Sequence, residues 1–209
     1  MPAASISEFV ILAVVLAVTP GADTMVVLRN AASQGTTAGL ATTVGIKIGT
    51  AVHATLASVG VAALLLQYSG FYTVLKVLGA AYLVALGAIG IVRAVRNSNK
   101  SVTSDNGRQK SRMQCLAEGF LSNLLNPKVV LFYVAVLPQF IAPGDPVAAT
   151  ALKLGAIHVG ASLVWLCLVS FFVGAAQTWL RAPAVRRWVE ITSGLAIAAF
   201  GFRLAMSTR

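Results

Sequence analysis

Long apolar segments and short polar connections alternate along the whole chain. Six of the apolar segments approach or exceed the roughly 20 residues that an α-helix needs to cross a bilayer. The alternating ten-residue segments typical of a membrane β-barrel are not visible. We therefore expect an all-α integral membrane protein with six transmembrane helices. Their expected ranges are 6–30, 38–66, 69–95, 115–141, 147–180 and 187–206.

The composition supports this prediction. Of the 209 residues, 57% are hydrophobic and only 11% are charged, whereas about a quarter of the residues in soluble domains are charged. In a soluble chain, a net charge of +10 raises the question of nucleic-acid binding. Here the basic residues lie mostly between apolar segments, a placement that membrane topology explains better. We expect no nucleic-acid partner.

The basic residues also predict the orientation of the chain. They gather in the polar connection 96–112, after the first segment and before the sixth, whereas the opposite side has only Arg203 and Arg209, at the end of the chain. By the positive-inside rule, the connection 96–112 lies in the cytoplasm and both termini lie outside. Its composition suits a solvated tether, and a regulatory role stays open. The basic residues on the inner side are Arg29, Arg96, Lys100, Arg108, Lys110, Arg112, Arg181, Arg186 and Arg187.

The two halves of the chain resemble each other. The segments "GIKIGTAVHA" (45–54) and "ALKLGAIHVG" (151–160) share an apolar-Lys-apolar-Gly core that is followed by a histidine. We therefore divide one membrane domain into a repeat over 1–95, a basic cytoplasmic loop over 96–114 and a second repeat over 115–209. Because three spans per repeat is an odd number, the second repeat enters the membrane in the opposite sense. Such inverted repeats are common in secondary transporters.

Proline interrupts the first and fourth segments at corresponding places. In hydrocarbon every backbone polar group needs a partner inside the protein, and a proline leaves carbonyls free before the break and N–H groups free after it. Paired breaks of this kind are typical of a transport site, although kinks needed only for packing are the alternative. The candidate substrate-binding residues at the breaks are Thr19, Pro20, Gly21 and Asp23, with Asn123, Asn126, Pro127 and Lys128.

Lys47 is a further candidate, because it lies well inside the second segment. At about 100° per residue, Lys47 shares a polar or small stripe with Thr50, Ala54 and Ser58. We expect this stripe to face the cavity, and Lys47 and Thr50 to bind substrate; a Lys47 side chain that extends to the interface is the alternative. A neighbouring stripe is expected to pack closely against another helix. It consists of Gly45, Gly49, Gly60 and His53, whose ring is expected to form a hydrogen bond there.

Four residues are candidates for coupling transport to protons. Asp23 occupies the first turn after the break, where a carboxylate also stabilises the helix N-terminus. His158 can titrate near neutral pH, but a buried, hydrogen-bonded histidine is the simpler interpretation. Lys153 lies near the edge of its segment, so the interface is an equally good place for its side chain. Lys47 completes the set.

The interrupted segments resemble the LysE/RhtB family of bacterial amino-acid exporters. The likeness rests on "TPGADTMVVLRNAASQGTTAGLATTVGIKIG", on "GFLSNLLNPKVVLFYVAVLPQF" and on "VLKVLGAAYLVALGAIGIVRA" over 74–94. It implies a six-helix inner-membrane protein that exports amino acids in exchange for protons. One departure matters: many members have an acidic residue where this chain has Thr50, and a small or neutral one at Lys47.

That departure makes the expected cavity more positive than in a lysine exporter, so we expect a small neutral, zwitterionic amino acid as substrate. Its carboxylate is expected to meet Lys47 or Lys128, and its ammonium to meet Asp23 and the free carbonyls. No GxxxxGK[ST] loop is present, which favours secondary transport. We expect no cofactor, no metal site and no enzymatic activity. Glycine-rich surfaces permit a homodimer and fit internal packing equally well.

Three other functions fit the sequence less well. Efflux of a soft metal cation needs clustered thiolate or imidazole ligands, and two histidines with two separated cysteines do not make such a cluster. A thiol-disulfide carrier needs two cysteines that can meet, whereas Cys115 and Cys167 lie in different segments. A scaffold subunit accounts for the spans but not for the paired breaks.

Overall fold

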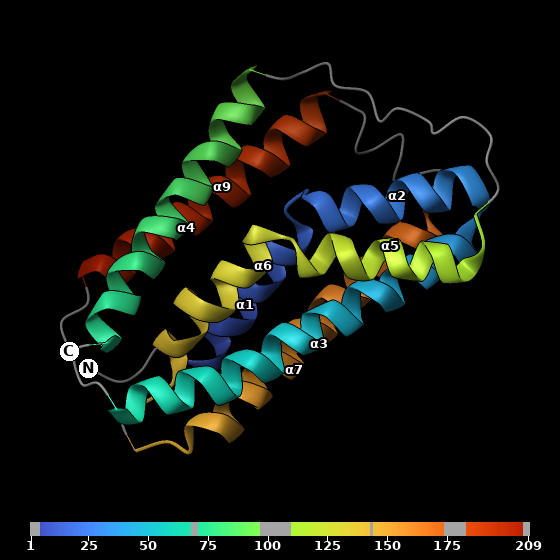
Figure 1. Ribbon diagram of the computed structural model, residues 1–209. Helices are drawn as coiled ribbons and strands as arrows, with labels where there is room; N and C mark the ends of the chain where they lie inside the picture. Colours follow the sequence, from blue (N-terminus) through green and yellow to red (C-terminus); the bar gives the residue numbers. More distant parts are fainter. Residues whose placement is uncertain (1–4, 68–70, 97–109, 143, 174–182, 207–209) are drawn as a thin grey trace.

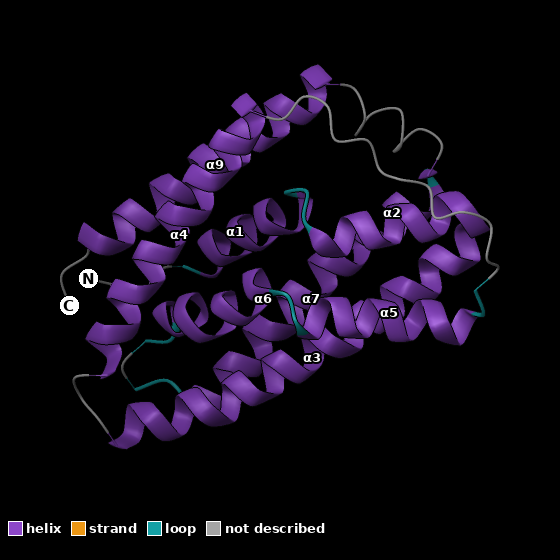
Figure 2. Ribbon diagram, turned by 45° about the horizontal axis from the view of Figure 1, so that its top comes forward, coloured by secondary structure: helices purple, strands orange, loops and turns teal. Residues whose placement is uncertain are grey.

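The computed structural model describes residues 5–67, 71–96, 110–142, 144–173 and 183–206, and these residues form helices and short connections without a strand (Figures 1 and 2). The predicted end of the fifth span (174–180) and most of the basic loop (97–109) lie outside the described residues. The helices are α1 (Ile6–Val18), α2 (Ala22–Gln34), α3 (Thr36–Gln67), α4 (Phe71–Arg96), α5 (Arg112–Leu124), α6 (Pro127–Leu131), the π-helical η1 (Phe132–Val136), the 3-10-helical η2 (Leu137–Phe140), α7 (Val147–Phe171) and α9 (Pro183–Met206).

The first and fourth predicted segments are both broken, as expected. α1 and α2 meet at an angle of 48°, and α5 meets the segment Pro127–Phe140 at 49°. Each broken unit begins with a serine capping box: Ser5 pairs with Glu8, and Ser111 pairs with Gln114. Such boxes satisfy backbone N–H groups of the first helical turn. The two broken units therefore share both their beginning and their interruption.

The helices are arranged in two groups. α4 and α9 lie side by side along their length (Figure 1), and their backbones approach closely, since a Cβ placed on Gly87 would lie 2.4 Å from the carbonyl oxygen of Gly194. α3 packs along both α5 and α7. α1 and α6 lie in the centre of the view between these groups (Figure 1). The breaks that end α1 and begin α6 are thereby held inside the molecule.

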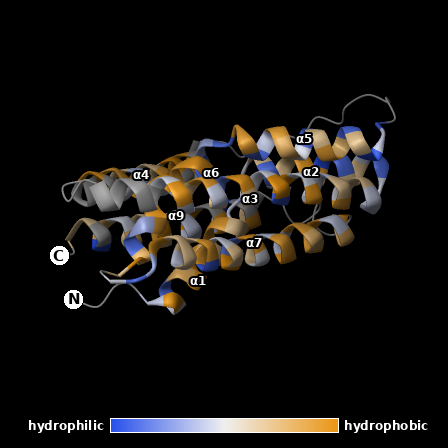
Figure 3. Ribbon diagram, turned by 60° about the horizontal axis from the view of Figure 1, so that its bottom comes forward, coloured by the Kyte–Doolittle hydropathy of each residue, from blue (hydrophilic) through white to orange (hydrophobic). Residues whose placement is uncertain are grey.

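Large apolar side chains remain exposed along the helices. Ile11, Leu56, Val77 and Phe202 are each more than half exposed, and hydrophobic residues, in orange, recur along the helices in Figure 3. A water-facing surface would leave this area unfavourably hydrated, whereas lipid solvates it. The exposed apolar surface therefore fits a membrane-embedded helical protein.

The prediction of six spans is not confirmed as a whole. By length and apolar composition, Val147–Phe171 can cross a membrane alone, and counting each bent pair as one span raises the number among the described helices to three. Six spans, their inverted arrangement and the division of the chain into two repeats stay predictions.

A polar cluster joins α2 to α5 beside the start of α5. The Glu118 carboxylate accepts hydrogen bonds from Arg29, from Asn30 at 2.9 Å and from Lys110 at 3.2 Å. Asn30 also donates to the Thr42 hydroxyl at 2.9 Å and so includes α3. At the opposite end, Arg203 of α9 pairs with Glu8 of α1 at 2.5 Å. This second pair places the start of α1 beside the end of α9.

Candidate functional site

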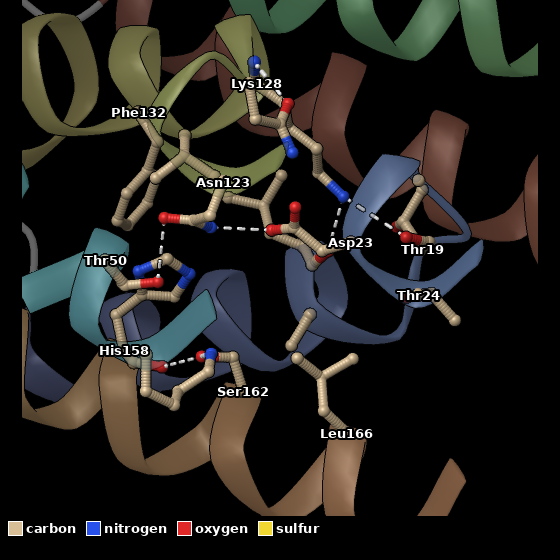
Figure 4. A pocket seen from close by; sticks show the side chains of 16 residues that line it. Thr19, Asp23, Thr24, Thr50, Asn123, Lys128, Phe132, His158, Ser162 and Leu166 are labelled. Carbon is tan, nitrogen blue, oxygen red and sulfur yellow. Dashed lines mark hydrogen bonds between the residues drawn. The ribbon is translucent and has the colours of Figure 1, made fainter. Parts of the chain in front are cut away.

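A cavity lies where the two breaks face each other, with an empty volume of about 520 Å³ that includes its mouth (Figure 4). Apolar residues from two buried clusters line it, with Leu16, Val129 and Phe132 from one and Leu166 from the other. The remaining lining residues are Ala17, Thr19, Gly21, Asp23, Thr24, Lys47, Thr50, Asn123, Asn126, Lys128, His158 and Ser162.

The first break is completed by Lys128. In an unbroken helix the N–H of residue 20 donates to the carbonyl of Leu16, four residues back, but Pro20 has no N–H. The ammonium of Lys128 takes its place and donates to the Leu16 carbonyl at 2.6 Å and to the Thr19 carbonyl at 3.2 Å. A side chain of α6 therefore satisfies two carbonyls at the end of α1.

The second break is completed mainly by local bonds. The side chain of Asn126 accepts a hydrogen bond from the backbone N–H of Lys128 at 3.1 Å and so caps α6. Pro127 leaves the carbonyl of Asn123 without its helical donor, and this oxygen accepts the N–H of Asn126 at 3.0 Å. The ring Nε2 of His53 lies 3.4 Å from the same oxygen. At each break, a backbone carbonyl thus lies beside a nitrogen of a side chain from the other half of the chain.

Asp23 is held by side chains of the second half. Its Oδ2 accepts a hydrogen bond from Asn123 at 2.7 Å, and its Oδ1 has a longer contact with the Ser122 hydroxyl, at 3.5 Å. The Thr50 hydroxyl donates to Oδ1 of Asn123 at 3.2 Å. A chain of bonds therefore runs from α3 through the buried Asn123 to the carboxylate at the start of α2 (Figure 4).

A second chain of bonds crosses from α3 to α7. The Lys47 ammonium donates to the Ser162 hydroxyl at 2.5 Å, and Ser162 donates in turn to the backbone carbonyl of His158 at 2.7 Å. Nδ1 of His158 lies 3.1 Å from the hydroxyl of Tyr133. Tyr133 and Phe132 begin the π-helix η1, a rare element that is often found at functional sites.

Most of the predicted site residues are brought together. Of the candidates, nine line the cavity: Thr19, Gly21, Asp23, Lys47, Thr50, Asn123, Asn126, Lys128 and His158. Pro20 and Pro127 make the breaks at its edges, in the turns that precede α2 and begin α6. Whether these residues bind substrate stays a prediction.

Lys153 is exposed on α7 and is not among the described residues that line the cavity. The packing stripe is confirmed at Gly45 and Gly49, which lie against α5, and at His53 through its contact with Asn123. It is wrong at Gly60, because a Cβ there would meet nothing within 4 Å among the described residues.

Seven of the lining residues were not predicted from the sequence: Leu16, Ala17, Thr24, Val129, Phe132, Ser162 and Leu166. Ser162 had one usable signal, because it lies four residues after His158 and therefore on the same helical face. Phe132, Thr24 and Leu166 are ordinary core residue types, and only the tertiary packing brings them to the cavity.

The charges in the cavity are unequal. One carboxylate, Asp23, faces two ammonium groups, those of Lys47 and Lys128. Within the described part of the chain, no group of three or more His, Cys, Asp or Glu side chains is placed to hold a metal ion. The positively charged lining suits a solute that carries at least one negative charge.

Comparison with known proteins confirms the predicted resemblance. The model of the LysE type translocator family matches residues 14–208. An uncharacterized membrane protein of Bacillus subtilis (strain 168), YrhP, is 26% identical over 208 residues, which cover 97% of this chain and 99% of that protein.

Two further relatives match over nearly their whole length. An uncharacterized membrane protein of Vibrio cholerae is 29% identical over 197 residues and covers 94% of each chain. An uncharacterized membrane protein of Pseudomonas aeruginosa, PA4757, is 31% identical over 214 residues, with 100% of this chain and 98% of the relative covered. No solved structure matches. The chain belongs to the family of LysE type translocators.

Proposed function

We propose that this protein is a secondary active exporter of small neutral amino acids or their derivatives, driven by proton antiport. Its family consists of translocators and not of enzymes, and membership makes the chain a membrane-embedded translocator of amino acids or similar solutes. The neutral substrate and the exchanged proton are the parts that we propose. We also propose the bacterial inner membrane as its location.

The cavity between the two breaks carries this proposal, because it presents both signs of charge to one solute. The substrate carboxylate binds the Lys47 ammonium and the N–H groups of the first turn of α2. The substrate ammonium binds Asp23. The carbonyls of Leu16 and Thr19 were expected to share that ammonium, but Lys128 already occupies both, so we assign the substrate ammonium to Asp23 alone.

The apolar wall of the cavity supports a small aliphatic side chain on the substrate. Leu16, Val129, Phe132 and Leu166 supply this wall, and burying a methylene group there contributes about 0.8 kcal/mol. A cationic side chain is disfavoured, because it would add another positive charge to those of Lys47, Lys128 and the substrate's own α-ammonium. Efflux of a bare metal cation is disfavoured by the same repulsion.

Asp23 is the proposed proton carrier. Its carboxylate lines the cavity and pairs with the substrate ammonium, so protonation weakens substrate binding and deprotonation restores it. This competition between proton and substrate is the simplest form of antiport. His158, which is hydrogen-bonded to Tyr133, is proposed as a structural partner of that site.

Counterflow in proteoliposomes tests the proposal. A panel of radiolabelled amino acids is offered to the purified protein, with and without an imposed pH gradient. We expect uptake of at least one neutral amino acid, a response to the gradient, and loss of that response in Asp23→Asn. Absence of exchange for every amino acid contradicts the substrate class. Exchange that ignores the gradient in wild type contradicts the antiport alone.

A further inference from the structure

We infer that the Lys128 ammonium is a built-in ligand of the carbonyl oxygens of Leu16 and Thr19 at the first break. Because it occupies the position between these two oxygens, it determines which substrates the cavity accepts. Its place at the break follows from the hydrogen bonds alone. Its effect on substrate choice rests on the proposed transport of amino acids. Lys128 is therefore a specificity-determining residue as well as part of the cavity wall.

The geometry of the break points to this role. Pro20 denies the Leu16 carbonyl its helical partner, and the Lys128 ammonium lies 2.6 Å from that oxygen. The same nitrogen lies 3.2 Å from the Thr19 carbonyl. Both oxygens belong to residues that line the cavity. The two carbonyl oxygens can therefore accept hydrogen bonds from one primary ammonium group, and the protein supplies that group from Lys128.

The other cavity lysine, Lys47, has different partners. A comparison of the two lysines therefore distinguishes the effect of a lost positive charge from the effect of a lost ligand at the first break. Lys47 donates to the hydroxyl of Ser162 at 2.5 Å, and within the described part of the chain it is not hydrogen-bonded to a backbone carbonyl of the break. Neutralising either lysine removes one positive charge from the cavity. Only the loss of Lys128 also empties the position at Leu16 and Thr19, so Lys47 provides a matched control.

Chemical replacement of the ammonium tests the position independently of transport. Detergent-purified Lys128→Ala and Lys47→Ala are heated with ethylammonium chloride or with tetramethylammonium chloride, which has the same charge but no N–H donor. We expect ethylammonium to raise the unfolding temperature of Lys128→Ala alone, and tetramethylammonium to raise neither. An equal shift in both variants, or no shift in Lys128→Ala, overturns the inference.

A second variant covers the case in which Lys128→Ala does not fold. Pro20→Ala returns a backbone N–H to the carbonyl of Leu16, so it relieves part of the need for Lys128. The double variant Pro20→Ala/Lys128→Ala is then expected to be recovered in higher yield than Lys128→Ala. A double variant that is recovered no better than the single one overturns the inference.

Transport then tests substrate choice. With the position emptied, the side-chain ammonium of L-lysine has carbonyl partners, so we expect Lys128→Met to raise counterflow of L-lysine relative to the neutral substrate by about tenfold, the value of about 1.4 kcal/mol. Lys47→Met should raise the ratio of L-lysine counterflow to neutral-substrate counterflow by less. Equal ratios in the two variants show that charge alone decides. Failure of wild-type exchange contradicts the proposed function but leaves the ethylammonium result standing.

Discussion

The side-chain amide of Asn123 donates to the Asp23 carboxylate over 2.7 Å and thereby joins the end of α5 to the start of α2. The two breaks are therefore linked by side chains as well as by proximity. Any movement that separates α2 from α5 has to exchange this bond for another. The bond also orients Asp23, which is the only carboxylate among the described lining residues of the cavity.

Replacing Asn123 by Ala should weaken substrate exchange. A hydrogen bond to a charged group contributes about 1.5–3 kcal/mol, so we expect at least a tenfold higher apparent KM in counterflow. Ser122→Ala is the matched control, since Ser122 contacts the other carboxylate oxygen at the longer distance of 3.5 Å. Equal losses in the two variants contradict a special role for Asn123.

The lysines of the two similar segments 45–54 and 151–160 should differ in importance. Lys47 lines the cavity, whereas Lys153 is exposed on α7. We expect Lys47→Gln to reduce exchange of a neutral amino acid by an order of magnitude or more, because the carboxylate loses a charged partner, and Lys153→Gln to leave it within about twofold. Initial rates at several substrate concentrations measure both. A large effect of Lys153→Gln on coupling to the pH gradient would restore it as a coupling residue.

The contact between α3 and α5 should not tolerate a side chain at Gly45. A Cβ there would lie 1.9 Å from the carbonyl oxygen of Leu116, so the helices must separate. We expect Gly45→Ala to lower the free energy of unfolding in detergent by about 1–3 kcal/mol, the usual cost of overpacking. Gly60→Ala lies on the same helix with open space around it and should lower it by much less.

The polar cluster around Glu118 should contribute more than the pair at the other end. Glu118→Gln leaves Arg29 and Lys110 without their shared carboxylate, and we expect a loss of about 2 kcal/mol in unfolding free energy. Arg203→Gln breaks an ion pair whose arginine is 69% exposed, and exposed pairs contribute under about 1 kcal/mol. Denaturant titration measures the free energy of unfolding of both variants. A larger loss in Arg203→Gln than in Glu118→Gln would contradict the greater contribution of the Glu118 cluster.

Thiol labelling tests the orientation of the chain. In a variant with Cys115 and Cys167 replaced by Ala, a new cysteine is introduced by Ser104→Cys or Ser207→Cys. The positive-inside rule places position 104 in the cytoplasm and position 207 outside. A membrane-impermeant maleimide added to intact spheroplasts should therefore label only Ser207→Cys. Labelling of Ser104→Cys alone reverses the predicted orientation.

The breaks could be predicted from the sequence because they are local. A proline removes its own N–H wherever it stands, so Pro20 and Pro127 indicated interrupted helices without knowledge of their neighbours. The partners of the freed carbonyls are not local. Lys128 was expected to meet substrate, and only the folded structure shows that its ammonium is already bonded to the carbonyls of Leu16 and Thr19.

The likeness between the segments 45–54 and 151–160 predicted only part of the structure, for the same reason. Lys47 and Lys153 occupy the same short motif, but their neighbours differ, so one lies in the cavity and the other is exposed. Gly60 shows that spacing also fails where the partner helix has ended. The sequence pattern specifies which face of a helix is small or polar, and tertiary packing decides how far along the helix that face is used.

The bond between Lys128 and Leu16 joins residues that are 112 positions apart, and this separation has a consequence for biosynthesis. Ribosomes add about 5–20 residues per second, so Lys128 is synthesised on the order of ten seconds after Leu16. During that interval α1 is present without the ammonium that completes it. Until the second half of the chain is synthesised, water, lipid headgroups or the insertion machinery must donate hydrogen bonds to the carbonyls at the first break.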